Sequence, residues 1–282
     1  MKYHPTIQKL DAAASEFHAL GLMREKTETF RLAGALQQHL LKTSPFGNST
    51  RFLDQQWVWA LGHIGLTHQL IRWFRHTEPD TKLILECTGS ANNHFLVQLQ
   101  PYISIVPQLI DMTMGQAEIA RAEDFVSRNA VYFGCPDGRH SIVDFYKMVE
   151  RECEGEWLLK LSDEQKLRTA TILLELGVKH PYVALQPRKM PHEPERNMSE
   201  QQMRAALSNY PDHDVVITGL DECTMKYPSV QSMPDPHEAS FLLSAACDQF
   251  IGSNSGAWTI AHAYQRPVEI INDRERAAWI YQ

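Results

Sequence analysis

The stretch Phe250-Ile251-Gly252-Ser253-Asn254-Ser255-Gly256 joins a short apolar run to a corner made of glycine, serine and asparagine. A helical run over residues 257–264 follows it, and then a second apolar run over residues 267–271. This order predicts a strand, a turn, a helix and a second strand, with the turn where the carboxyl end of the strand meets the amino end of the helix. The stretch therefore predicts a parallel α/β fold built around this corner.

The corner has the composition of an anion-binding turn. Gly252 and Gly256 allow a tight turn and the close approach of a ligand. Ser253, Asn254 and Ser255 offer hydroxyl, amide and main-chain donors beside the positive end of a helix dipole, which suits a phosphate or diphosphate. The competing interpretation is an ordinary helix N-cap, because serine and asparagine are favoured cap residues.

Composition narrows the class of protein. A chain of 282 residues exceeds the usual size of one core and predicts two domains of about 120 to 160 residues each. The net charge of −7 argues against a general nucleic-acid-binding surface. The cysteines lie far apart without a C-x-x-C pair, and no apolar run approaches about 18 residues, which together predict reduced thiols in a cytoplasmic protein.

The first half of the chain predicts a helical extension followed by an α/β domain. Residues 6–41 have helical periodicity that is interrupted at Gly21, and these helices are expected to cover the first sheet or to serve a homodimer. Strands alternate with helices after them. The predicted strands are residues 56–61, 82–86, 103–106 and 130–133, and the predicted helices are residues 66–76, 91–99 and 141–153.

The second half repeats this alternation. Gly177 is expected to end one helix, and Ser199 with Gln202 to form the capping box of another. The predicted helices are residues 163–176, 200–209, 238–246 and 274–281, with strands at 182–186 and 214–218 before the corner. We therefore predict a helical extension over residues 1–55 and two Rossmann-like domains over residues 56–158 and 159–282, facing each other across a cleft.

Ligands of open parallel sheets bind beyond the carboxyl ends of the strands. This rule selects the loops at residues 62–65, 88–93, 187–197, 219–222 and 252–256. In them Arg188 is placed to give forked hydrogen bonds to a phosphate, with Lys189 beside it. Both residues could equally be solvated loop charges.

Other polar residues of these loops could take part in chemistry. His63, inside the Gly62-His63-Ile64-Gly65 sequence, could take a proton from an acceptor hydroxyl, or its ring could cap a neighbouring carbonyl. Asp221 and Glu222 could contact sugar hydroxyls or serve the turn itself. His237 and His262 are weaker candidates.

The corner resembles the donor-site motif of GT-B-type glycosyltransferases. Heptosyltransferases carry a similar G-x-[DN]-S-G turn, and a bacterial family of glycosyltransferase-like proteins has a nearly identical I-G-[ST]-N-S-G motif. In that bacterial family the second domain begins with a strand ending in H-x-R, followed by an Arg-Asn pair. Gln186-Pro187-Arg188 and Arg196-Asn197 are similar, with Gln186 in place of the histidine, and Gly219 matches in order. In the first half only the sequence at residues 62–65 is similar, at the loop where heptosyltransferases place an acidic base.

The resemblance implies two facing Rossmann-like domains, in which the second holds a nucleotide-sugar donor and the first recognises the acceptor. We predict Arg188 and His63 as catalytic residues, the histidine from its place in this sequence and not from the family, which has an acidic base there. The predicted donor-binding residues, from the resemblance and from the strand-end loops together, are Gly62, Gly65, Arg188, Lys189, Arg196, Asn197, Gly219, Asp221, Gly252, Ser253, Asn254, Ser255 and Gly256. The acceptor could be a saccharide, a lipid-linked glycan, a protein or a modified nucleic acid.

No acidic cluster resembles the D-x-D pair that metal-dependent sugar-nucleotide enzymes use to hold a divalent ion, so we expect a metal-independent glycosyltransferase with no cofactor beyond its nucleotide-sugar substrate. Two alternatives share this architecture. One is an epimerase that acts on nucleotide sugars, and the other is a non-catalytic binding or assembly module.

Overall fold

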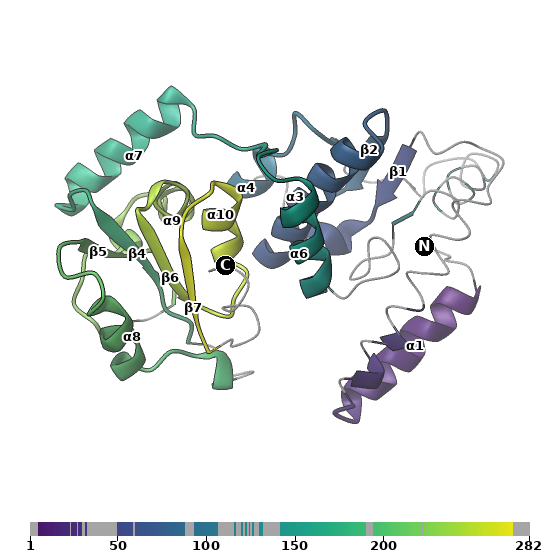
Figure 1. The fold of residues 1–282 in the computed structure, drawn as a ribbon, viewed down its shortest axis with the longest axis horizontal. Coiled ribbons are helices and arrows are strands. Elements are labelled where there is room, and N and C mark those ends of the chain that lie inside the picture. The colour runs from purple at the N-terminus through teal and green to yellow at the C-terminus, as the bar shows by residue number, and fades with distance from the viewer. Residues whose placement is uncertain are drawn as a thin grey trace. The chain divides into compact units, whose positions relative to one another are not determined.

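The computed structural model describes residues 5–22, 24–26, 28–29, 32, 50–58, 60–87, 93–106, 116, 120, 122, 124, 126, 130–131, 142–189, 194–221 and 223–272. Its contacts divide the chain into two compact units (Figure 1). The first contains Met1–Trp59 and Leu66–Glu156, and the second contains Ala60–Gly65 and Trp157–Gln282. Each unit is described below by itself.

The first unit is built on a parallel three-stranded sheet with the order β1-β2-β3. Phe52 pairs with Ile84, and Ile84 pairs with Ser104, so the strands run in register from β1 to β3. The strands are β1 (Thr50–Leu53), β2 (Lys82–Glu86) and β3 (Ser104–Val106). The helices are α1 (Pro5–Ala19), α3 (Leu61–Thr77), α4 (His94–Val97) and α6 (Ile142–Glu152), with the 3-10 turn η1 (Gln55–Val58). The first turn of α3, up to Gly65, belongs to the second unit.

The strand predicted at residues 56–61 is wrong. The first strand is β1, and Gln55–Val58 forms a 3-10 turn instead. Asp54 starts that turn, because its side chain accepts a hydrogen bond from the Gln56 amide at 3.0 Å and its carbonyl accepts one from the Trp57 amide at 3.1 Å. A short apolar run is buried equally well in a strand or in such a turn, so its hydrophobicity could not separate the two.

The other predicted strands of the first unit, and one predicted helix, are present in whole or in part. The strand at residues 82–86 is confirmed, and the strand at residues 103–106 is present as β3. Of the strand predicted at residues 130–133, Ala130 forms a single bridge with Phe52, and residues 132–133 lie outside the described part. The helix predicted at residues 91–99 is the shorter α4, which Asn93 caps by accepting hydrogen bonds from the Phe95 and Leu96 amides.

The second unit is built on a parallel four-stranded sheet with the order β5-β4-β6-β7. The central strands β4 and β6 are buried along almost their whole length, which explains their continuous apolar runs. The strands are β4 (Tyr182–Gln186), β5 (Asp214–Ile217), β6 (Gln249–Ser253) and β7 (Val268–Ile271), and the helices are α7 (Asp163–Leu176), α8 (Glu200–Leu207), α9 (Pro236–Ala246) and α10 (Trp258–Ala263), with the 3-10 turns η2 (Pro194–Arg196) and η3 (Val230–Ser232).

Local signals set the ends of these helices. Ser162 and Ser199 each form a complete capping box, and Gly177 ends α7 in the left-handed conformation with φ of 69°. Asp235 caps α9, and a proline follows in its first turn. The strands and helices predicted between residues 163 and 271 are therefore all present, with ends that differ by a few residues. The helix predicted at residues 274–281 lies outside the described residues.

None of the described helices is both long enough and apolar enough to span a lipid bilayer.

Candidate functional site

The carboxyl ends of the strands of the second sheet meet at one edge. Gln186, at the end of β4, pairs with Gly252 of β6, and Ser253 pairs with Ile271 at the end of β7. Because all four strands are parallel, the segments that follow them start from this same edge. Three of the five predicted loops, at residues 187–197, 219–222 and 252–256, therefore start together.

Arg196 joins two of these loops. Its Nε donates a hydrogen bond to the carbonyl oxygen of Asn254 at 2.7 Å, and its Nη2 donates to the same oxygen. The guanidinium thus holds the backbone of the corner from η2, which lies 58 residues earlier in the chain. Arg196 is half-buried, so its charge lies beside the corner in partly desolvated surroundings.

Arg188 is buried in the same region, with 7% of its surface exposed. Its Nη1 donates a hydrogen bond to Oδ1 of Asn197 at 3.1 Å. The carbonyl of Asn197 accepts from Nδ2 of Asn272 at 2.7 Å, and Oδ1 of Asn272 accepts from Nε2 of Gln202 at 2.6 Å. This chain of hydrogen bonds ties Arg188 to the segment after β7 and to α8, so its guanidinium is held in place.

Asp221 and Lys189 are brought together through the backbone. The Asp221 carboxylate accepts a hydrogen bond from the Lys189 amide at 3.0 Å, and the Asp221 carbonyl accepts from Nε2 of Gln231 at 2.9 Å. A Cβ atom on Gly219 would lie 3.1 Å from Pro187, so the two loops also pack tightly there. The Asp221 carboxylate is thus engaged in shaping these loops. Glu222 lies outside the described residues.

The corner itself is not an ordinary N-cap. The residue at the N-cap position of α10 is Ala257, which makes no side-chain cap hydrogen bond. The hydroxyl oxygens of Ser253 and Ser255 are both buried, and neither has a hydrogen-bond partner among the described residues. Buried hydroxyls normally have a partner, so these two are exceptions among the described residues.

The helix that follows the corner is shorter than predicted. α10 has 6 residues, and a macrodipole from so few peptide units is weaker than that of a long helix. Anion binding at the corner would therefore depend on the serine hydroxyls and the nearby guanidinium groups rather than on the dipole.

Gly62 and Gly65 lie within a helix, which corrects the prediction of a strand-end loop. Both belong to the first turns of α3. A Cβ atom on Gly65 would come 2.4 Å from Cβ of Thr259, and one on Gly256 would come 2.1 Å from the nitrogen of Gly62. These glycines allow the start of α3 to pack against the segment from Gly256 to Thr259, inside the second unit.

His63 lies in this first turn of α3 and is half-buried. Its amide donates to the carbonyl of Ala60 at 2.9 Å. His63 therefore belongs to the same compact unit as the corner, although it lies in the first half of the sequence.

The remaining histidines have other surroundings. His237 is exposed on the first turn of α9. The His262 ring contacts Trp157 and Trp258 edge-on, with centroid distances of 5.5 and 5.7 Å. The packing of His262 between two indole rings favours a structural role.

The sequence reasoning missed one D-x-D sequence, Asp212-His213-Asp214, which lies outside the strand-end loops. The Asp214 carboxylate accepts a hydrogen bond from the Lys179 amide at 2.7 Å, at the amino end of β5. This acidic pair is therefore at the opposite edge of the sheet from the corner.

That opposite edge also carries a groove of about 930 Å³. The groove is lined by residues that precede β4, β6 and β7, and by none of the residues predicted for the site. Ligand sites of open parallel sheets lie at the carboxyl edge, so we place the candidate site at the corner and not in this groove. The lining residues include Leu159, Lys160, Val178, His180, Ala246 and Arg266.

Comparison with known proteins supports the fold. No protein-family model and no curated protein sequence matches the chain. The family 9 glycosyltransferase from Veillonella parvula matches with a TM-score of 0.51 and 10% identity, over 80% of this chain and 81% of that one. The chain has a fold similar to that of this glycosyltransferase.

Two further solved structures match less closely. The ADP-heptose LPS heptosyltransferase II from E. coli matches with a TM-score of 0.47 and 11% identity, over 79% of this chain and 84% of that one. TibC, an iron-containing dodecameric glycosyltransferase from enterotoxigenic E. coli, matches with a TM-score of 0.42 and 14% identity, over 79% of this chain and 58% of that one. At these identities the likeness concerns the fold.

Proposed function

We propose that this chain is a metal-independent glycosyltransferase that moves a sugar from a nucleotide-diphosphate donor to an acceptor hydroxyl. The fold similar to that of a family 9 glycosyltransferase supports this proposal. The observation that carries it is the pair of buried serine hydroxyls, of Ser253 and Ser255, beside the Asn254 carbonyl that Arg196 holds.

In the proposed donor complex, Ser253 and Ser255 donate hydrogen bonds to diphosphate oxygens. Leaving a buried hydroxyl without a partner costs about 1–3 kcal/mol, so a ligand that accepts from both would be stabilised by relief of that cost. The buried guanidinium of Arg188 neutralises the negative charge that grows on the leaving diphosphate. Because the contacts of Asn197 and Asn272 already hold the Arg188 guanidinium, this side chain needs little rearrangement during the reaction.

In the proposed reaction the acceptor oxygen attacks the anomeric carbon of the donor sugar. The bond from that carbon to the diphosphate oxygen breaks, and its electron pair leaves with the diphosphate. His63 takes the proton of the acceptor hydroxyl on a ring nitrogen.

The proposal assigns no role to a metal ion, because the D-x-D pair at residues 212–214 is at the other edge of the sheet. The proposal allows four classes of acceptor: a saccharide, a lipid-linked glycan, a protein or a modified nucleic acid.

Calorimetric titration with a panel of nucleoside diphosphates and nucleotide sugars tests the proposal. We expect one nucleoside diphosphate to bind and to raise the melting temperature of the chain, since a ligand of the folded state stabilises it. If no member of the panel binds, the chain is a non-catalytic module and the proposal fails. Conversion of the donor sugar without any acceptor would identify an epimerase instead.

A further inference from the structure

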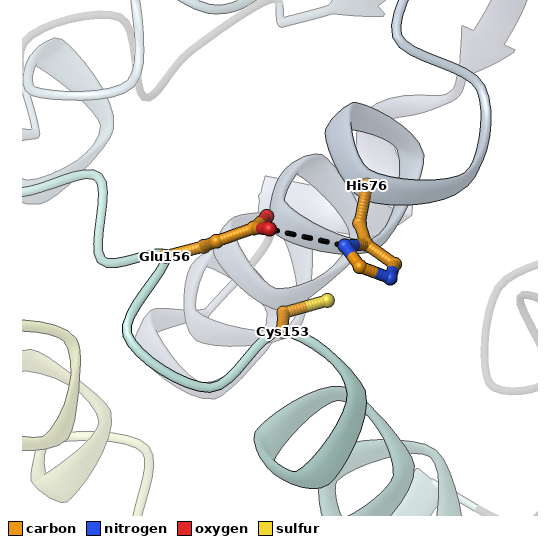
Figure 2. Close-up of side chains that lie close together, drawn as sticks. All are labelled: His76, Cys153 and Glu156. Atoms are coloured by element: carbon orange, nitrogen blue, oxygen red, sulfur yellow. Dashed lines mark hydrogen bonds and ion pairs between the residues drawn. The ribbon is translucent and has the colours of Figure 1, made fainter.

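Three side chains capable of binding a metal lie close together in the first unit (Figure 2). They are His76, Cys153 and Glu156, and one ligand atom from each lies within 4.8 Å of the others. In Figure 2 the Cys153 sulfur points toward the space between the imidazole and the carboxylate. All the residues proposed for the donor site belong to the second unit, so this cluster is a separate feature.

Helix ends and a tight turn bring the three residues together. His76 lies in the last turn of α3, and Cys153 follows the last residue of α6. The chain then turns, with the Glu156 amide donating to the Cys153 carbonyl at 3.1 Å. Gly155 makes this turn with φ of 78°, in the left-handed region that favours glycine. The turn carries the Glu156 carboxylate back over the thiol.

The buried side chain of Arg72 holds this arrangement. Its Nη2 donates to the Cys153 carbonyl at 2.9 Å, and its Nε donates to the Glu156 carbonyl at 3.2 Å. Arg72 precedes His76 by one turn of the same helix, so the two side chains lie on one face of α3. The backbone of the turn after α6 is therefore fixed to the helix that presents the imidazole.

The donor set matches zinc. Imidazole nitrogen, thiolate sulfur and carboxylate oxygen are the ligands that zinc takes in proteins, with bonds of about 2.0–2.3 Å. Ligand atoms of a tetrahedral ion with such bonds lie about 3.2–3.8 Å apart. The His76 Nδ1 and Glu156 Oε1 atoms are now 3.0 Å apart as an ion pair, and both side chains are exposed, so small rotations would admit an ion between them.

The local charges favour a divalent cation. The carboxylates of Glu150, Glu152 and Glu156 lie near the Cys153 thiol, as does the guanidinium of Arg72. Arg72 is itself paired with Glu150 at 2.5 Å. The three carboxylates outnumber this guanidinium and would attract a metal ion, which takes the place of the thiol proton when the sulfur binds it.

We propose that His76, Cys153 and Glu156 bind one zinc ion, with a fourth position open to water or to a ligand. The ion would connect the end of α3 to the turn after α6 and so stabilise the first unit. The competing interpretation is a plain ion pair between His76 and Glu156 above an inert buried thiol.

Metal titration of the full chain distinguishes the two. Protein stripped of metal is titrated with Co²⁺, which gives a thiolate-to-cobalt charge-transfer absorption when a cysteine binds it. We expect one equivalent of Co²⁺ to produce this absorption, and Cys153→Ser to abolish it. The matched control is Cys247→Ser, because Cys247 is as fully buried as Cys153 but lies in the second unit. Absorption that persists in Cys153→Ser would overturn the proposal.

Zinc affinity, measured in competition with a chromophoric chelator, gives an independent test that leaves the core intact. We expect His76→Gln and Glu156→Gln each to weaken zinc binding by at least about ten-fold. Removal of a group that merely orients a metal ligand already lowers the affinity by about that factor. The control is His180→Gln, since His180 forms a similar exposed pair with Asp248 at 2.9 Å. Equal zinc affinity in all three variants would refute the site.

Discussion

The backbones of Gly62 and Gly256 lie so close together that a Cβ atom on Gly256 would come 2.1 Å from the Gly62 nitrogen. Nearby, the Thr259 hydroxyl is shared between the carbonyl of Gly256 at 2.6 Å and the carbonyl of Leu61 at 3.1 Å, although Leu61 and Thr259 are 198 positions apart in the sequence. The start of α3 is therefore attached to the corner by backbone packing and by a hydrogen bond. This attachment makes the first turn of α3, with His63, part of the second unit.

Gly256→Ala is predicted to destabilise the chain by about 3 kcal/mol, because the added methyl group would overlap backbone atoms that cannot rotate away. Urea unfolding measures the change. Gly62→Ala is the matched control, since its Cβ atom would meet Gly256 at 3.3 Å, and we expect it to cost less than about 1 kcal/mol. Equal effects of the two substitutions would contradict the packing described.

Ser253→Ala is predicted to stabilise the free protein slightly while weakening nucleoside diphosphate binding. The buried hydroxyl has no partner among the described residues, so its removal relieves a cost of about 1 kcal/mol or more. Thermal unfolding and calorimetric titration measure the two effects. Ser244→Ala is the control, because the Ser244 hydroxyl on α9 is also buried and has no partner among the described residues. Ser244→Ala should stabilise the protein as much as Ser253→Ala does and leave nucleoside diphosphate binding unchanged. A loss of binding in both variants would contradict the assignment of Ser253 to the donor site.

Arg188→Ala is predicted to lower the rate of sugar transfer by roughly 10²-fold or more, because a held charge beside the leaving group is lost. Steady-state kinetics with the donor found by titration measures this rate. Arg204→Ala removes an exposed arginine of α8 that pairs with Glu200, and should leave the rate unchanged. Transfer by Arg188→Ala at the rate of the unaltered protein would exclude the proposed role.

His63→Ala is predicted to remove the acidic limb of the pH–rate profile, since the proposed base must be unprotonated to accept a proton. The profile of kcat/KM against pH is the measurement. His237→Ala, which removes an exposed histidine of α9, should keep that limb. Should the limb survive in His63→Ala, another group is the base.

Asp248 is predicted to make stability depend on acid pH. Partial burial raises the pKa of its carboxyl, but hydrogen bonds from the His180 ring at 2.9 Å and the Tyr182 amide at 2.8 Å outweigh burial and hold that pKa below its ordinary value. A depressed folded pKa stabilises the protein above the unfolded value of 3.8, and this contribution is lost as pH falls through the folded value.

Urea unfolding at about pH 6 and about pH 3 should therefore show a smaller loss of stability in Asp248→Asn than in the unaltered chain. Asp163→Asn is the control. Its carboxylate also has a lowered pKa, because Lys166 donates a hydrogen bond to it, but it is fully exposed and solvent weakens such a pair. A pH response of Asp248→Asn identical to that of the unaltered chain would rule out this contribution.

The elements of the second unit could be predicted because their signals are local. The capping box of Ser199 and Gln202 and the left-handed Gly177 act within a few residues, and the apolar run of β4 is long enough to be recognised. The prediction of a strand at residues 56–61 was wrong because a short apolar run has no capping residue or glycine to mark its structure. Asp54 starts a 3-10 turn there instead.

The sequence by itself determined the alternation of strands and helices in the second unit, the caps of α7 and α8, and the corner at residues 252–256, since each depends on neighbouring residues and on hydrophobic periodicity. Only the tertiary structure decided that Gly62 packs on Gly256, that Arg196 holds the Asn254 carbonyl, and that His76, Cys153 and Glu156 meet. These contacts join residues far apart in the chain, so they depend on how the completed elements pack and not on the local sequence.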